Sequence, residues 1–408
     1  MAHIEDRWFA PKLDQEGRPV LNGRGKPLLA RSPRHGTGLR YRVRYIGPDG
    51  RERSKSFPDR EKRAADAFLA TVEADKYRGT FIDPTAGQVP FSEFAETWLR
   101  SRTYDKSTME SLELRVRKHI LPFFGARPLS SIKPSAVAEW DAELSSVLAQ
   151  DTRSVAFAYL RMIFSAAVDD ERIAKNPCSA KSVKQPRPAQ RQVIPWTYDE
   201  VSAIRAGLLP RYRPLVDLGA GCGLRQGEIF GLSPDDFDLD GGWLYVRRQV
   251  KRVYSRLVFG LPKNDKERRV PLPASIGAVI RAYPVAPIPV SLPWEDPDSE
   301  DLVTVRLMFT TPRRNAINRS DFNSKSWHKA LESVGIPRTR ATGMHALRHF
   351  YASTLLDAGE NIRALAAYLG HADPGFTLRV YTHLMKASEA RTRSAIDALF
   401  STPLVVAG

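Results

Sequence analysis

The chain has 408 residues and a formal net charge of +16, with only two cysteines, Cys178 and Cys222. Its length favours two or three domains, and the excess of Lys and Arg indicates a polyanionic partner, nucleic acid before an anionic membrane. The sequence excludes a membrane-spanning helix, because no apolar run approaches the roughly 20 residues that a bilayer requires, and it excludes a disulfide framework and a cysteine zinc site.

The first 80 residues predict a small basic module, with 18 Lys and Arg against 11 Asp and Glu. From Arg40 to Tyr45 basic and apolar residues alternate, and in a β-strand this alternation places them on opposite faces. A turn, a basic return strand and a helix capped by Asp59 should follow. A solvated hairpin with charged edges is one interpretation, and we favour a cationic ribbon that contacts DNA through Arg40, Arg42, Arg44, Arg51, Arg53 and Lys55.

Several stretches have the composition of loops. Residues 10–36 are rich in Pro, Gly and basic residues and predict a long loop or a partly disordered insertion. Residues 283–301 are crowded with proline and predict a surface loop, and residues 79–89 and 181–192 predict linkers. No internal repeat is evident.

The rest of the chain predicts a helical bundle and then a mainly helical domain. Four apolar stretches with helical spacing lie between residues 90 and 175. Thr197 and Glu200 fit a capping box that starts a helix, and a small antiparallel sheet is expected from Trp243–Val250, Arg256–Leu261 and Arg269–Leu272. The predicted fold class is multidomain α+β, with domains at residues 1–80, 88–178 and 195–402.

Residues suited to phosphodiester chemistry gather near the C-terminus. Cutting a phosphodiester requires a nucleophile, cations at the non-bridging oxygens and a proton donor for the leaving oxygen. His345 and Arg348 lie three residues apart, on one face of a predicted helix. Arg225 begins a helix after a glycine-rich turn, where its guanidinium could bind a phosphate in bidentate fashion.

Each of these residues also has an ordinary structural interpretation. Arg225 could form a helix-terminal salt bridge with Glu228, and a His–Arg pair on a helix can simply stabilise it. Most tyrosines are packing residues, so Tyr351 and Tyr368 compete with Tyr381 as the nucleophile.

Taken together, five segments resemble the tyrosine recombinase family, of the phage-integrase type, over most of residues 85–400: Gly223–Ile229, Pro262–Arg269, His345–His349, Leu369–His371 and Tyr381–His383. The resemblance implies that Tyr381 is the nucleophile, ten residues after His371. It implies a catalytic set of Arg225, Lys263, His345, Arg348, His371 and Tyr381.

The resemblance also implies the role of each residue. Arg225, supported by Glu228, and Arg348 bind the scissile phosphate. His345 is the general acid and base, and His349 is a structural neighbour. His371 bonds to the phosphate and packs against the helix of the nucleophile.

The catalytic lysine has two candidates. Lys263 lies on a predicted hairpin before Arg268 and Arg269, as in the family, and would protonate the departing 5′-oxygen. Pro262 and the residues at 264–265 depart from the family pattern, which leaves Lys266 as the alternative.

The function implied is that of a site-specific DNA recombinase of a phage or integrative element, which integrates or excises DNA through a 3′-phosphotyrosine intermediate. An arm-type DNA-binding domain, a core-binding domain and a catalytic domain would follow one another along the chain. The alternatives are a type IB topoisomerase and a non-catalytic DNA-binding regulator. The sequence has no phosphate-binding loop and no acidic cluster for magnesium, so we expect no metal and no other cofactor.

The expected partners are double-stranded attachment-site DNA and further copies of the chain in a homotetramer, with an excision factor or a host DNA-bending protein as further candidates. A C-terminal tail carrying Ala390, Ile396, Leu399 and Phe400 would dock on a neighbouring subunit or on its own domain. With no signal-peptide core in residues 1–10 we expect a cytoplasmic location.

Overall fold

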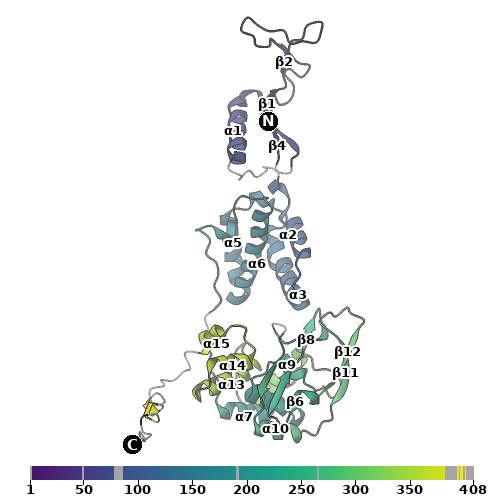
Figure 1. Ribbon diagram of the computed structural model, residues 1–408, viewed down its shortest axis with the longest axis vertical. Coiled ribbons are helices and arrows are strands. Elements are labelled where there is room, and N and C mark those ends of the chain that lie inside the picture. The colour runs from purple at the N-terminus through teal and green to yellow at the C-terminus, as the bar shows by residue number, and fades with distance from the viewer. Residues whose placement is uncertain are drawn as a thin grey trace, which may run out of the picture. The chain divides into compact units, whose positions relative to one another are not determined.

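The computed structural model describes residues 2–47, 50–77, 86–189, 193–263 and 266–381, together with 393–394, 396–397 and 400. The chain divides into two compact units (Figure 1), one formed by Met1–Thr103 and Ser111–Ala189 and the other by Tyr104–Glu110 and Gln190–Gly408. In the described ranges no helix is long and apolar enough to cross a membrane.

The N-terminal part of the first unit is an antiparallel sheet with one helix, as predicted. Strands β1 (His3–Asp6), β4 (Tyr41–Ile46) and β5 (Glu52–Phe57) run in the order β1-β4-β5, and helix α1 (Lys62–Tyr77) packs on one face. The core between sheet and helix consists of Tyr41, Val43, Tyr45, Phe57, Ala65 and Val72.

The predicted cationic ribbon is divided between the two faces of this sheet. The register of β4 with β5 places Arg53 and Lys55 opposite core residues of β4. Directly opposed residues share a face, so Arg53 and Lys55 lie on the core side and not with Arg42 and Arg44. The Lys55 ammonium lies 4.7 Å from the centre of the Phe68 ring, a cation–π contact at the edge of the core. The expectation of one cationic face was therefore wrong for Arg53 and Lys55.

Two arginines of the ribbon are bound by carboxylates. Arg40 bonds to Asp6 at 2.8 Å and to Asp59 at 2.6 Å. Arg44 bonds to a glutamate on each neighbouring strand, at 3.0 Å and 3.3 Å. Asp59 thus binds an arginine of the sheet, and the prediction that its side chain caps a helix was wrong.

Residues 9–31 form a folded unit and not the predicted loop. Strands β2 (Phe9–Pro11) and β3 (Leu29–Arg31) pair as an antiparallel stem. Two short hairpins lie between them, closed by bridges between Leu13 and Pro19 and between Leu21 and Pro27. Figure 1 shows the two lobes that extend from β2. Because the stem and the two hairpins make three short ribbons, we call residues 9–31 the three-lobed unit.

The two hairpins are an eight-residue repeat, contrary to the expectation of none. Residues 13–20 and 21–28 share only Leu, Gly and Pro at equivalent positions, and three further positions hold chemically similar residues. So short and degenerate a repeat becomes evident only from the common backbone geometry.

The rest of the first unit is a helical bundle, as predicted. Its helices are α2 (Phe91–Arg100), α3 (Lys106–Arg115, of which residues 111–115 belong to this unit), α4 (Leu121–Phe124), α5 (Pro134–Val147) and α6 (Gln150–Asp169), with a π-helical turn at Val116–Ile120. Large aromatic side chains fill its centre: Phe91, Phe124, Trp140, Phe157 and Phe164.

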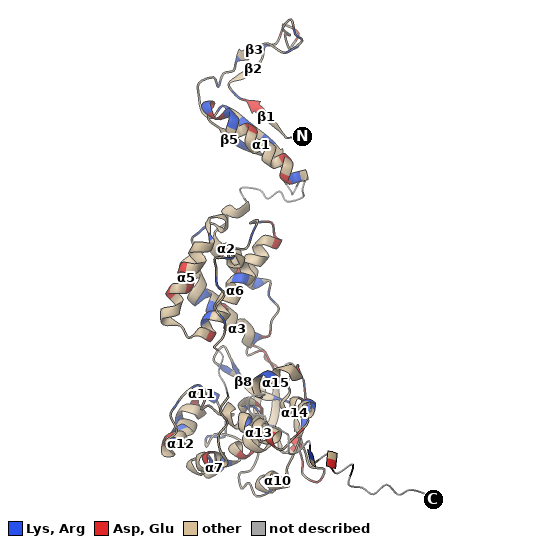
Figure 2. Ribbon diagram, turned by 90° about the vertical axis from the view of Figure 1, so that its left-hand side faces the viewer, with Lys and Arg blue, Asp and Glu red and all other residues tan. Residues whose placement is uncertain are grey.

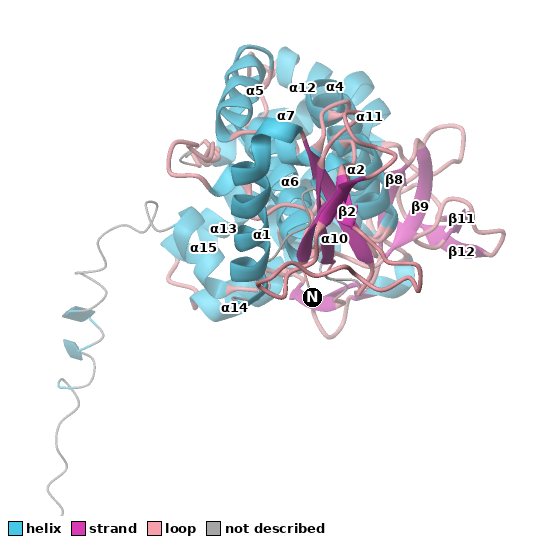
Figure 3. Ribbon diagram, turned by 90° about the horizontal axis from the view of Figure 1, so that it is seen from above, coloured by secondary structure: helices cyan, strands magenta, loops and turns pink. Residues whose placement is uncertain are grey.

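The second unit is mainly helical (Figure 3). Its helices are α7 (Tyr198–Gly207), α8 (Arg213–Cys222), α9 (Gln226–Phe230), α10 (Ala274–Arg281), α11 (Arg319–Phe322), α12 (His328–Ser333), α13 (His345–Asp357), α14 (Ile362–Leu369) and α15 (Pro374–Tyr381). The predicted capping box is present, because the Thr197 hydroxyl accepts from the amide of Glu200 at 3.2 Å and the Glu200 carboxylate accepts from the amide of Thr197 at 2.7 Å.

The strands of the second unit form separate small sheets. They are β6 (Phe237–Asp238), β7 (Trp243–Val246), β8 (Gln249–Val253), β9 (Arg256–Gly260), β10 (Arg268–Pro271), β11 (Ile288–Pro293) and β12 (Leu302–Leu307). The predicted single sheet is in fact two sheets, because β7 pairs with β10 and β6 whereas β8 pairs with β9. The proline-rich residues 283–301 contain β11, which pairs with β12 and corrects the prediction of a plain loop.

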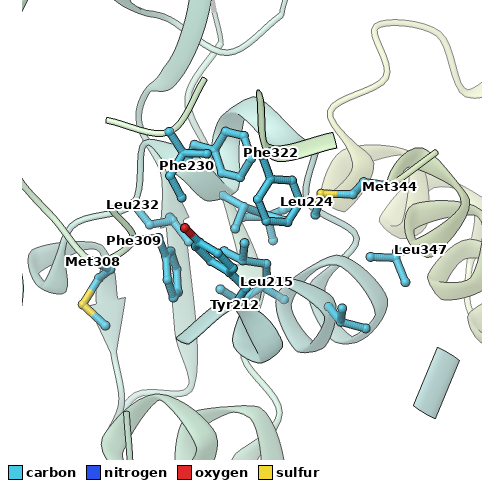
Figure 4. Packing of buried hydrophobic residues seen from close by; sticks show 14 of the residues in the cluster. Tyr212, Leu215, Leu224, Phe230, Leu232, Met308, Phe309, Phe322, Met344 and Leu347 are labelled. Atoms are coloured by element: carbon cyan, nitrogen blue, oxygen red, sulfur yellow. The ribbon is translucent and has the colours of Figure 1, made fainter. Parts of the chain in front are cut away.

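One hydrophobic core joins these elements (Figure 4). Leu215 of α8, Phe230 of α9, Phe309 and Leu347 of α13 are all less than 2% exposed. The core therefore connects the helix that precedes Arg225 with the helix that carries His345 and Arg348.

Helices α8 and α13 approach closely because α8 presents glycines to α13. A Cβ atom added at Gly219 would lie 2.8 Å from Leu347 Cδ1, and one added at Gly223 would lie 2.4 Å from the Tyr351 ring. Gly223 also ends α8 in the left-handed conformation, with φ of +67°. Gly219 and Gly223 are four residues apart, and so are Leu347 and Tyr351. The two contacts therefore fix the rotation of α13 about its own axis.

We expect Gly223→Ala to lower the free energy of unfolding by about 2–5 kcal/mol, because it adds a steric collision to an unfavourable left-handed residue. Gly335→Ala is the matched control, since Gly335 has φ of +71° and open space around it. The control should lose only about 1–2 kcal/mol. Urea unfolding measures both, and equal losses would contradict the close contact of α8 with α13.

Candidate active site

Arg225 lies between α8 and α9, at the N-cap position of α9. Its guanidinium Nη1 bonds to Glu228 Oε1 at 2.9 Å, and its backbone amide donates to Glu228 Oε2 at 2.8 Å. Nη2 donates to the carbonyl of Gly370 at 3.4 Å. The side chain is 19% exposed, so the guanidinium keeps an edge open to solvent.

Glu228 is fully buried and also binds Arg268 of β10. The Arg268 guanidinium forms a bidentate pair with Glu228, at 2.9 Å and 2.7 Å, and its Nε donates to the carbonyl of Tyr368 at 2.8 Å. Burial alone would raise the pKa of Glu228, but the hydrogen bonds and charge of Arg268, and then the charge of Arg225, lower it to about 2. The sequence marked Arg268 only as a landmark, and the structure shows that it shares the carboxylate with Arg225.

Arg348 lies on α13 and is 1% exposed. Its Nη1 donates to the carbonyl of Gly223 at 2.8 Å, and its Nη2 contacts the carbonyl of Leu369 and His371 Nε2. Burial, together with the charge of Arg225, lowers the pKa of Arg348 to about 9. The guanidinium thus connects the end of α8 with the turn between α14 and α15.

His371 lies on that turn, after α14 ends at Gly370 and before α15 begins at Pro374, as predicted. Its Nε2 is 3.0 Å from Nη2 of Arg348, and its Nδ1 is 2.7 Å from the hydroxyl of Thr377. A guanidinium nitrogen can only donate, so Nε2 is the acceptor and the Nδ1–H donates to Thr377. Burial, and then the charge of Arg348, lowers the pKa of His371 to about 4, which keeps the ring neutral at pH 7.

Tyr381 ends α15 and bonds to a histidine of α13. Its side chain is 2% exposed, and its hydroxyl lies 2.7 Å from His349 Nδ1. Burial raises the pKa of Tyr381 to about 12, and burial with the charge of Arg348 lowers the pKa of His349 to about 4. The phenol and the imidazole are therefore both neutral at pH 7 and are joined by one hydrogen bond.

His349 was expected to be only a structural neighbour, and this hydrogen bond makes it the protein group that contacts the Tyr381 hydroxyl. The available signal was its position, one turn after His345 on the same predicted helix. The two rings are 4.7 Å apart, edge to face.

His345 and Arg225 border an open groove of about 590 Å³. Its lining includes five cationic residues and no acidic one: Arg225, Lys251, Arg252, Arg319 and Arg340. His345 is an exposed residue of this groove. Partial burial, and then the neighbouring His349 and Arg348, lower its pKa below the ordinary value, so the ring is neutral at pH 7. The groove suits a polyanion whose phosphate meets Arg225 and His345.

Neither candidate lysine takes part in these side-chain contacts within the described residues. Lys263 and Lys266 are both exposed, on either side of residues 264–265, which lie outside the described residues. Neither lysine has an ion pair within the described ranges, so the choice between them stays a prediction. Tyr368 is half-buried on α14, and Tyr351 is buried against Gly223.

The predicted tail lies largely outside the described residues, including Ala390 and Leu399. Of its other two named residues, Ile396 is 50% and Phe400 is 83% exposed. Across the described ranges, no group of three or more His, Cys, Asp or Glu side chains could hold a metal ion.

Two family models match the chain. The phage integrase family model matches residues 197–388, and the model of the phage integrase N-terminal SAM-like domain matches residues 90–145. The integrase of Mycobacterium phage D29 is 27% identical over 342 residues, which cover 82% of this chain and 86% of that protein. An integrase/recombinase of Escherichia coli is 30% identical over 242 residues, 54% of this chain and 68% of that protein.

Solved structures share the fold. The integrase of transposon Tn1549, in complex with a circular intermediate DNA, aligns with a TM-score of 0.64 at 19% identity, covering 76% of this chain and 99% of that one. A lambda integrase tetramer bound to a Holliday junction aligns with a TM-score of 0.55 at 16% identity, covering 81% and 93%.

We expect Glu228→Gln to lower the free energy of unfolding at pH 7 by about 3–5 kcal/mol, because two guanidinium groups lose their shared carboxylate. The folded-state pKa of about 2 is below the unfolded value of 4.5. The carboxylate therefore stabilises the fold fully above about pH 4.5 and loses this effect as the pH falls toward 2. Urea unfolding should show the gap between wild type and variant shrinking from pH 5 to pH 3.

Asp240→Asn is the control, since the Asp240 side chain is fully exposed in its pair with Arg281. It should change the free energy of unfolding little at any pH. A gap for Glu228→Gln that stays constant on acidification would contradict the assigned ionisation.

Proposed function

The chain belongs to the phage integrase family of tyrosine recombinases and is a site-specific DNA recombinase, and on this premise we propose that Tyr381 is the nucleophile that cuts and rejoins DNA. The observation that carries the proposal is a pair of adjacent hydrogen bonds. Arg348 bonds to His371, and the next residue of α13, His349, bonds to Tyr381. A phosphate, two arginines, a neutral histidine and a tyrosine hydroxyl can meet there.

In the proposed reaction the Tyr381 oxygen attacks the scissile phosphorus. The bond from phosphorus to the 5′-oxygen breaks, which leaves a 3′-phosphotyrosine and a free 5′-hydroxyl. Attack by the 5′-hydroxyl of another strand reverses the step, releases the tyrosine and joins the two DNA ends. No nucleotide hydrolysis is needed, because the phosphotyrosine conserves the phosphodiester bond.

The side chains have distinct proposed roles. Arg225 and Arg348 neutralise the non-bridging oxygens, and Glu228 orients Arg225. His349 is neutral at pH 7 and lies closest to the phenol, so it is the group to which the Tyr381 proton can first pass. His345 transfers protons at the phosphate from the groove side.

The described arrangement is a resting one. The Tyr381 hydroxyl is covered, and its pKa of about 12 disfavours the phenolate. Entry of a phosphate beside Arg348 must therefore accompany a displacement of α15, which frees the hydroxyl from His349. A nucleophile kept protonated until DNA is bound cannot react with stray phosphodiesters.

The domain assignment is likewise a proposal. Residues 1–80 form an arm-type DNA-binding domain, residues 88–178 the core-binding domain and residues 195–402 the catalytic domain. The two family models support the second and third domains, and the exposed cations of the N-terminal module support the first. We propose attachment-site DNA as the substrate and a homotetramer as the active assembly, supported by the fold shared with the lambda integrase tetramer on a Holliday junction.

We expect Tyr381→Phe to abolish covalent attachment to nicked suicide duplexes made from DNA that flanks the gene, because no nucleophilic oxygen remains. Denaturing gels measure the adduct, and Tyr368→Phe, half-buried nearby, is the control that should retain it. An adduct that persists in Tyr381→Phe and disappears in Tyr368→Phe would move the nucleophile to α14.

The catalytic lysine can be identified with a sulfur leaving group. Lys263→Ala should slow cleavage of ordinary DNA by roughly 10²–10⁴-fold, because the 5′-oxygen must leave without a proton. A 5′-bridging phosphorothiolate substrate should restore its rate, since a thiolate leaves unprotonated. Lys266→Ala should cleave both substrates at nearly the normal rate, and the reverse pattern would assign the role to Lys266.

A further inference from the structure

The three-lobed unit (residues 9–31) is built around a ring of backbone hydrogen bonds. The amide of Lys12 donates to the carbonyl of Leu28 at 2.7 Å, that of Val20 to Lys12 at 2.8 Å, and that of Leu28 to Val20 at 2.7 Å. These residues are eight positions apart, and each follows a proline. The stem and the two hairpins therefore meet with approximate threefold symmetry.

Both hairpins close in the same way. Asp14 Oδ1 accepts from the amides of residues 16 and 18, at 2.9 Å and 2.8 Å, and Asn22 Oδ1 accepts from those of residues 24 and 26, both at 3.0 Å. Gly17 and Gly25 have φ of +78° and +70°, the left-handed conformation that ends a three-residue hairpin loop. This hydrogen bonding gives the side chains of the unit defined positions.

Strand pairing sorts these side chains onto two faces. Each of the three ribbons has a leucine opposite a proline, and opposed residues share a face. One face therefore carries Pro11, Leu13, Pro19, Leu21, Pro27 and Leu29. Side chains alternate along a strand, so the residues next to these prolines lie on the other face. That face carries one cation per proline: Lys12, Arg18 and Lys26.

These three cations are available to an anionic partner. Arg18 pairs at 3.1 Å with Glu16, but the two side chains are 77% and 69% exposed, so the pair is weak. Lys12 and Lys26 are exposed and have no ion pair within the described ranges. By contrast, Arg40 and Arg44 of the neighbouring sheet are each bound by two carboxylates.

The stem is anchored to the sheet. The Arg40 guanidinium lies 4.8 Å from the centre of the Phe9 ring, and the His35 ring packs edge-on against Phe9 at 5.1 Å. The Trp8 indole donates to the carbonyl of Thr37 at 3.1 Å. Figure 2 shows β2 and β3 beside the sheet that carries β1 and β5. The cations of the three-lobed unit are thereby presented by a braced structure.

We propose that the three-lobed unit is a DNA-binding element in which Lys12, Arg18 and Lys26 bind the phosphate backbone of duplex DNA. The proposal deepens the DNA-binding function proposed for residues 1–80 and rests on it. Five cationic and two acidic residues occur in residues 9–31, and contacts of Lys and Arg with phosphates carry no sequence information, so the proposed contact is independent of sequence. The charge of the cationic face favours DNA as its partner. The leucines lie on the opposite face, and replacing them tests whether that face makes the contact instead.

The experiment measures affinity of the full-length protein for a mixed-sequence DNA duplex over a range of salt concentrations. Each phosphate contact adds about 0.9 to the slope of log affinity against log salt. The triple variant Lys12→Gln, Arg18→Gln, Lys26→Gln should therefore reduce the steepness of this slope by about 2–3. A control with the same charge change on the same module, Arg60→Gln, Lys62→Gln, Arg63→Gln, should reduce it by less than about 1.

A second variant separates lost charge from lost structure. Replacing residues 12–28 with Asn-Gly would close β2 and β3 as a two-residue hairpin, and it should reproduce the slope of the triple variant while circular dichroism stays unchanged. Leu13→Ser, Leu21→Ser, Leu29→Ser should bind as wild type does.

Three results would overturn the proposal. The first is an equal slope for wild type and the cation variant. The second is an equal effect of the cation variant and its control. The third is weaker DNA binding in the leucine variant alone, which would move the contact to the leucine face. The covalent adduct of Tyr381 on suicide DNA is independent of this slope, so the recombinase assignment can stand if the three-lobed unit does not bind DNA.

Discussion

A single buried carboxylate organises the catalytic part of the molecule. Glu228 has no exposed surface, and a buried charge is tolerated only when cations and hydrogen bonds surround it. Its two oxygens bind Arg225 and Arg268, and Arg268 reaches on to the carbonyl of Tyr368. The position of the phosphate-binding Arg225 is therefore set by β10 and α14 as much as by its own helix, and disturbance of any one of these elements would misplace the guanidinium.

Arg348 extends this dependence to the nucleophile. Its guanidinium joins the carbonyl that follows α8 to His371, and His371 bonds to Thr377 on the helix of Tyr381. Hydrogen bonds at 2.7–3.0 Å thus connect α8, α13 and α15 in one network. Because the groups of the network are buried or half-buried, each depends on its neighbours to remain satisfied, and a phosphate that replaced one partner of Arg348 would alter the rest.

Much of this arrangement could be predicted from the sequence, where the relevant signals are local. The capping box at Thr197, the helix of His345 and Arg348, and the turn at His371 follow from short-range rules of spacing and capping. The faces of Arg53 and Lys55 could not be predicted, because strand register decides them and a shift of one residue exchanges the faces. The partner of Tyr381 is 32 residues away in sequence, and only tertiary packing brings His349 to it. The three-lobed unit escaped prediction because its central hydrogen bonds join residues eight or sixteen positions apart, spacings that match neither a helix nor a strand.

The ring at the centre of the three-lobed unit also limits how this part of the chain can evolve. A duplication of eight codons adds one hairpin whose first leucine, glycine and proline already match those of the existing hairpins, so a single genetic event can enlarge the unit without altering the pairing of β1 with β4. Three amides and three carbonyls close the ring, and each further copy would bring one amide and one carbonyl of its own. Relatives that carry such an insertion should accordingly differ in length by whole lobes, whereas the sheet that holds them keeps a constant length.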